Sequence, residues 1–154
     1  MDVKDVKKEY EKFVGKYSLP SFKELNEDFE IDKIDRESDC FLRAVRKAIM
    51  EKVVNAIGFL EMLLNPMNAP RMYVPFVNTM AVSDNKEIDE LYTSLSKLSL
   101  ISLKLEVGYS EKEEAEVIKK VFEVWQKEKV KFGNLVDKIG KPVNSVKRER
   151  SYFG

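Results

Sequence analysis

Apolar residues recur along most of the chain at the three- and four-residue spacing of helices, and the longest such pattern covers 37–64. Its apolar residues fall on one wide helical face: Phe41, Leu42, Val45, Ala48, Ile49, Val53, Ala56, Ile57, Leu60, Leu63 and Leu64. The spacing predicts a central helix that starts near 35–38 and ends at Asn65, because Pro66 disfavours helical geometry in the residue before it. Cys40 falls inside this predicted helix, where we expect a small buried side chain.

Two shorter amphipathic stretches precede the central helix. Residues 2–17 carry apolar residues on one stripe, with Gly15 near its end. The segment 18–21 supplies a serine hydroxyl that can cap a second helix near 20–29, and Pro20 is tolerated in a first helical turn. We therefore predict two short N-terminal helices.

The loop at 65–83 follows the central helix and contains Pro66, Pro70 and Pro75, which exclude a regular helix. It is unusually apolar, with Met67, Met72, Tyr73, Val74, Phe76, Val77, Met80 and Val82. These side chains would form a large exposed patch if all of them faced water. Two interpretations remain: they cap the end of a bundle, or some of them form a docking surface.

A fourth helix is predicted at 83–107, where Ser83 or Asp84 with Glu87 resembles a capping box. Within 101–107 apolar and polar residues alternate as in a strand. Leucine favours a helix, and no neighbouring pattern supplies a second strand, so we predict helix, ended by Gly108.

The fifth predicted helix covers 111–139 and starts at a capping box formed by Ser110 and Glu113. Its apolar stripe keeps its phase across Gly133, which we expect to be a weak point. Gly140 and Pro142 are predicted to end it. The apolar stripe includes Trp125, which we expect in the core.

Together these patterns predict an all-α protein, an irregular bundle of three long antiparallel helices plus two shorter N-terminal helices. We expect a single helical domain at 1–140 and a basic C-terminal tail at 141–154. The 154 residues are enough for one full hydrophobic core.

The charge is balanced, with 27 basic and 27 acidic residues, which removes the whole-molecule argument for nucleic acid or an acidic membrane. The single cysteine excludes an intramolecular disulfide, and neither a signal peptide nor a membrane-spanning run is recognisable. We expect a cytoplasmic protein. The excess of Lys and Glu and the absence of His resemble proteins that work at high temperature.

Histidine is absent, so His-assisted nucleophiles and the zinc or di-iron sites built on His are excluded in their usual form. Nucleotide-binding motifs are also absent. We therefore expect a non-enzymatic protein without a cofactor or metal, and the alternative is an enzyme that uses carboxylates alone. The densest charged clusters are expected to be solvated: Glu113, Glu114 and Glu116; Glu87, Asp89 and Glu90; and the basic face of Arg43, Arg46 and Lys47.

The tail is the sharpest change in composition. Residues 138–154 hold five basic residues against the single acid Glu149, a local charge of +4. The chain ends in Tyr152, Phe153 and Gly154. The tail could bind a protein partner, contact RNA through phosphates and stacked bases, or be an inert solubilising segment.

The segment LPSFKELNEDFEI at 19–31 and the terminal YFG resemble a group of small, uncharacterised archaeal helical proteins. That resemblance implies a helical fold and no activity or site residue. The last three residues also resemble the hydrophobic-Tyr-any tripeptide with which proteasome activators dock, with Phe153 in place of the Tyr.

The combined interpretation is a helical adaptor that binds a protein partner through its tail and its apolar loop. The expected contact residues are Arg148, Arg150, Tyr152, Phe153, Met72, Tyr73 and Phe76. The alternative is an RNA- or ribosome-associated protein that uses the basic, aromatic tail. We expect no membrane binding, and self-association remains open.

Overall fold

The computed structural model describes residues 3–34, 39–77 and 82–152, with the backbone alone for Val3, Lys4, Asn68, Val82, Ser83 and 141–152. Within these ranges the chain is helical and contains no strand, which confirms the all-α prediction. In chain order the elements are α1 (Val3–Tyr17), α2 (Phe22–Phe29), the 3-10 helix η1 (Ile31–Lys33), α3 (Phe41–Leu64), the 3-10 helices η2 (Pro66–Asn68) and η3 (Arg71–Tyr73), α4 (Val74–Val77), α5 (Val82–Lys104) and α6 (Glu111–Tyr152).

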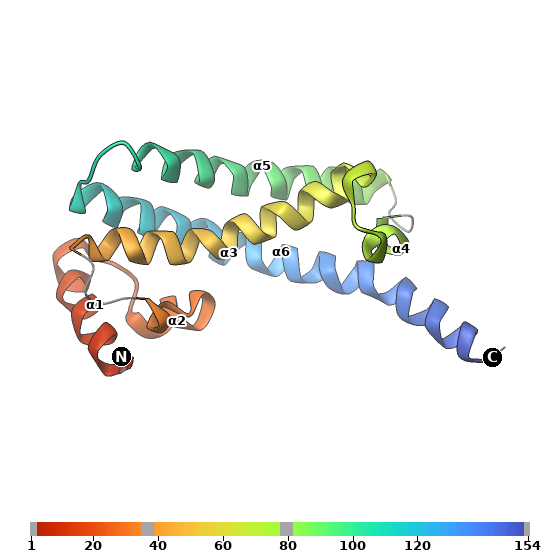
Figure 1. The fold of residues 1–154 in the computed structure, drawn as a ribbon, viewed down its shortest axis with the longest axis horizontal. Coiled ribbons are helices and arrows are strands. Elements are labelled where there is room, and N and C mark those ends of the chain that lie inside the picture. Colours follow the sequence, from red (N-terminus) through yellow and green to blue (C-terminus); the bar gives the residue numbers. More distant parts are fainter. Residues whose placement is uncertain (1–2, 35–38, 78–81, 153–154) are drawn as a thin grey trace.

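The three long helices α3, α5 and α6 lie side by side and contact one another along the long axis of the molecule (Figure 1). Consecutive long helices run antiparallel, so α3 and α6 point the same way. Their apolar stripes meet in one core, which includes Val53, Leu95 and Trp125 as buried members. This is the predicted bundle.

Helices α1 and α2 cover one end of the bundle (Figure 1). The buried Tyr10 hydroxyl donates to the carbonyl of Pro20 at 2.8 Å, which joins α1 to the turn before α2. The Phe29 ring of α2 lies 5.8 Å from that of Trp125 on α6. The carboxylate of Asp28 accepts from Gln126 and from Lys129 of α6, at 2.6 Å and 3.0 Å.

Two predicted helix starts are wrong by a few residues. Helix α2 begins at Phe22, since Ser21 is its N-cap and forms a capping box with Glu24, so Pro20 lies before the helix. Helix α3 begins at Phe41 after the half-buried Cys40. Cys40 is therefore at the N-cap position and outside the helix that we predicted to bury it, while 35–38 lie outside the described residues.

Helix α5 extends through Ile101 and ends at Lys104, which confirms helix over strand for most of the ambiguous segment. The predicted end near 107 is too late. The predicted capping box is also wrong, because the helix already begins at Val82. Asp84 instead binds Lys138 of α6 and ties the start of α5 to that helix.

Helix α6 continues through Gly140 and Pro142 to Tyr152, so the predicted end near 139 is wrong. A proline inside a helix removes one hydrogen bond and can be absorbed as a local bend. The residues after it include Lys, Arg and Glu, which favour helix. At 1.5 Å per residue α6 is roughly 63 Å long and α3 roughly 36 Å.

Candidate interaction surfaces

The connection between α3 and α5 closes one end of the bundle with aromatic rings. The Phe59 ring of α3 lies 6.2 Å from that of Tyr73 and 5.8 Å from that of Phe132 on α6, both edge-on. Tyr73 also contacts Phe76 at 6.1 Å. Tyr73 and Phe76, two of the predicted contact residues, are therefore half-buried against the bundle.

Other apolar residues of the same connection face solvent. Met67 is 91% exposed, Met72 is 70% exposed, and Val74 is also exposed. We call these three residues the loop surface. Each interpretation of the apolar loop thus applies to some of its residues. The aromatic rings cap the bundle, whereas the loop surface is exposed. Met80 lies outside the described residues.

The C-terminal part of α6 leaves the bundle at the same end. Ile139 is buried and Lys138 binds Asp84 of α5, so α6 still belongs to the bundle at these two positions. From there the blue helix in Figure 1 extends past the ends of α3 and α5. We call residues 140–152 the α6 extension; it adds roughly 20 Å of helix. α4 contacts α6 beside this exit.

The α6 extension carries the predicted tail contacts. Arg148, Arg150 and Tyr152 lie where the structure describes the backbone alone, and Phe153 lies outside the described residues. The structure therefore places the backbone of positions 148, 150 and 152 on one helix that projects past the ends of α3 and α5 (Figure 1). Their role as contacts stays a prediction.

A second exposed apolar surface was not predicted. On the outer face of α5 and the turn after it, Leu100, Leu103 and Val107 are 66%, 63% and 93% exposed. The sequence signal for Leu103 and Val107 is the alternation at 101–107, because a period of two on a helix places apolar residues on both faces.

At the opposite end of the bundle from the loop surface, a buried ion network joins α3, α5 and α6. Arg46 is 2% exposed and Glu114 is fully buried, and the Arg46 Nε donates to the Glu114 Oε2 at 2.5 Å. Arg43 donates to the other oxygen of Glu114 at 3.2 Å. Arg46 also donates to the Ser102 hydroxyl at 2.6 Å and binds Glu106 at 3.0 Å. We call these five residues the Arg46–Glu114 network.

This network corrects two predictions. Arg46 and Glu114 were expected to be solvated, and both are buried. Arg43 further donates to the carbonyls of Leu105 and Gly108 at 2.7 Å and 2.6 Å, so it holds the turn between α5 and α6. The hydrogen bond from the Arg46 guanidinium lowers the pKa of the Glu106 carboxyl. Because both Glu114 oxygens are occupied, the network acts as a structural clamp.

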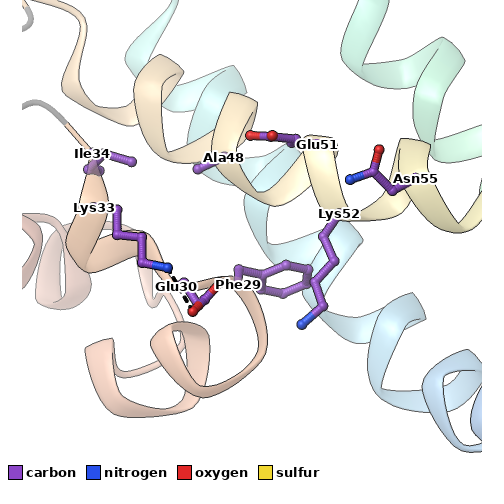
Figure 2. Close-up of a pocket in the computed structure, with 8 residues that line it drawn as sticks. All are labelled: Phe29, Glu30, Lys33, Ile34, Ala48, Glu51, Lys52 and Asn55. Atoms are coloured by element: carbon purple, nitrogen blue, oxygen red, sulfur yellow. Dashed lines mark hydrogen bonds and ion pairs between the residues drawn. The ribbon is translucent and has the colours of Figure 1, made fainter.

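A pocket of about 440 Å³ lies between α3 and the segment that follows α2 (Figure 2). Its lining consists of Phe29, Glu30, Lys33, Ile34, Ala48, Glu51, Lys52 and Asn55. Figure 2 shows Lys33 reaching Glu30, which it binds at 2.9 Å, and Lys52 beside the Phe29 ring. The charges of the two lysines and the two glutamates in the lining cancel, so the pocket favours neither an anion nor a cation.

Among the described residues, no group of three or more Cys, Asp and Glu side chains is placed to hold a metal ion. None of the described helices contains an apolar stretch of the length needed to span a bilayer.

We compared the chain with protein-family models, with curated proteins and with solved structures. None of the three comparisons found a significant match.

Proposed function

We propose that this protein is a non-enzymatic helical adaptor that binds a protein partner with the loop surface and the α6 extension. The observation that carries the proposal is the continuation of α6 to Tyr152, past the ends of α3 and α5 (Figure 1). A short helix without neighbours is only marginally stable in water, so a helix in this position gains stability from docking on a partner.

The sequence of the α6 extension suits helix-in-groove recognition. Val143 and Val146 follow Ile139 by four and seven residues, so positions 143 and 146 continue the helix face of position 139. The remaining positions are mostly polar or basic. The partner expected from this pattern offers an apolar groove with an acidic rim, and the basic residues speed the encounter.

The loop surface lies at the same end of the molecule as the α6 extension, which supports this end as the one that binds the partner (Figure 1). Exposed methionines adapt to varied apolar surfaces, and they are enriched at protein interfaces. Met67 and Met72 lie on the connection that contains α4, and α4 contacts α6. A partner bound to the extension could therefore cover the loop surface as well.

Truncation tests this proposal. A chain that ends at Gly140 lacks the extension but keeps every buried residue of the described core. We expect its melting midpoint to match that of the full chain, while a partner recovered from source lysate by the full chain is lost. The measurement is pull-down with both chains followed by mass spectrometry. Equal recovery of the same partner by both chains would contradict the proposal.

An RNA- or ribosome-binding role is the second candidate, because residues 141–154 carry four basic residues against Glu149. Phosphate contacts would make the affinity fall steeply as salt rises, whereas the affinity for an apolar groove should fall less steeply, because only the rim of that groove is charged. Binding of a single-stranded RNA at low salt, with a steep salt slope that truncation at Gly140 removes, would favour this candidate. We propose the cytoplasm as the compartment for either role, because Cys40 is the single cysteine of the chain.

A further inference from the structure

The outer face of α5 and the turn after it carry an exposed apolar seam. Leu100 and Leu103 are three residues apart on the helix, like an a and a d position of a coiled coil, and Val107 lies in the turn, because α5 ends at Lys104. All three side chains are exposed. We call these three residues the α5 seam.

The same segment is apolar on its inner side. Leu95, Leu98 and Leu105 are buried against the bundle. A helix with apolar residues on both faces is normally covered on both. α5 contacts both α3 and α6, but the residues of the α5 seam are exposed, so the seam is on the side that these two helices leave uncovered. The described part of the chain therefore leaves this face without a partner.

The charges beside the seam indicate what covers it. Between Thr93 and Leu105 the charged residues are Lys97 and Lys104, which are seven residues apart and lie along one edge of the seam. Both are exposed, and neither forms an ion pair with a described residue. Glu106, at the end of the seam, is already bound by Arg46 and Lys47. The edge of the seam therefore carries positive charge without a matching acid.

A second copy of the chain does not supply that acid, because the paired segment would be the same stretch of α5, which contains no Asp or Glu between Thr93 and Leu105. Two copies would bring lysines and serines to each other's edges. An amphipathic helix with its own apolar seam and with carboxylates at seven-residue spacing satisfies both features of the surface.

We infer that the α5 seam is a second docking surface, which takes an amphipathic helix whose edge is acidic. The seam lies at the opposite end of α5 from the loop surface (Figure 1). The inference therefore goes beyond the proposed adaptor function, and an adaptor with two separate surfaces could hold two partners at once.

The test uses two synthetic helical peptides with Leu at the a and d positions. One carries Glu at every flanking position and the other carries Lys. We expect the full chain to bind the Glu peptide at least about tenfold more tightly than the Lys peptide in a fluorescence anisotropy titration at low salt. The chain that ends at Gly140 should bind the Glu peptide equally well, which separates this test from the test of the α6 extension.

Two double variants complete the test. Leu100→Ser with Leu103→Ser should weaken binding of the Glu peptide at least about tenfold, because the apolar contact is lost. Lys97→Glu with Lys104→Glu should reverse the preference to the Lys peptide. All four positions are exposed, so both variants should melt close to the parent chain.

Several results would overturn the inference. These are equal binding of the two peptides, no binding of the Glu peptide, or a preference that the lysine reversal leaves unchanged. A dimer of the chain in sedimentation that Leu100→Ser with Leu103→Ser dissociates would show that a second copy occupies the seam, and it would overturn the inference too.

Discussion

Replacement of Glu114 by glutamine is expected to lower the free energy of unfolding by about 3–5 kcal/mol, the usual cost of leaving a buried charge without its partner. Arg46 is 2% exposed and its Nε donates to Glu114 at 2.5 Å, so water cannot replace the lost carboxylate without opening the bundle. Glu106 still binds the far end of the guanidinium, but its carboxylate is partly exposed and less able to compensate. Urea unfolding followed by circular dichroism measures the change.

The neighbouring Glu113 provides the matched control. It lies in the same first turn of α6 but is exposed, so Glu113→Gln should change the free energy of unfolding by no more than about 0.5 kcal/mol. Arg46→Met combined with Glu114→Leu should restore part of the loss seen in Glu114→Gln, because it removes both buried charges together. A Glu114→Gln chain as stable as Glu113→Gln would show that the pair is hydrated in solution.

The second large effect is expected at the loop surface. Met67→Ser combined with Met72→Ser should weaken the binding of the partner recovered by the full chain by about 2–3 kcal/mol, or roughly 30–150-fold in Kd, if both side chains are covered in the complex. The melting midpoint should hardly move, because both side chains face solvent in the free protein. Isothermal titration calorimetry with the purified partner measures the affinity.

A control is available on α3, where Val54 is 49% exposed and lies away from the connection. Val54→Ser removes apolar surface of a similar kind and should leave the partner's affinity unchanged. If the methionine variant binds as tightly as the Val54 variant, the loop surface does not take part in binding.

The helices could be predicted from the sequence because each carries a complete apolar stripe, and the stripes of α3 and α6 lead to Val53 and Trp125 in the core. Helix boundaries were less predictable. Pro142 is a strong stop signal locally, yet α6 continues through it, since a long helix loses a single hydrogen bond at a proline.

The Arg46–Glu114 pair could have been predicted from the periodicity of the sequence alone. Arg46 lies four residues after Leu42 and three before Ile49, so it stands on the apolar stripe of α3. Glu114 lies four residues before Ile118, on the stripe of α6. Opposite charges on the apolar stripes of two helices predict a buried ion pair. Residue type alone predicts that both residues are solvated, and that prediction is wrong.

The surfaces were less predictable because exposure depends on which faces the neighbouring helices cover. The loop at 65–83 is apolar throughout, but its Tyr73 ring packs against Phe59 while Met67 and Met72 are exposed. Leu100 and Leu98 are likewise the same residue type on one helix, and only Leu98 faces the bundle.

The α6 extension can be tested most directly by amide hydrogen exchange of residues 140–152, free and in complex with the partner. In the free protein these amides should exchange much faster than those of α6 near Trp125, because a helix without neighbours opens locally. The adaptor account predicts that binding slows their exchange. Unchanged exchange at 140–152 in a complex that protects other residues would contradict it.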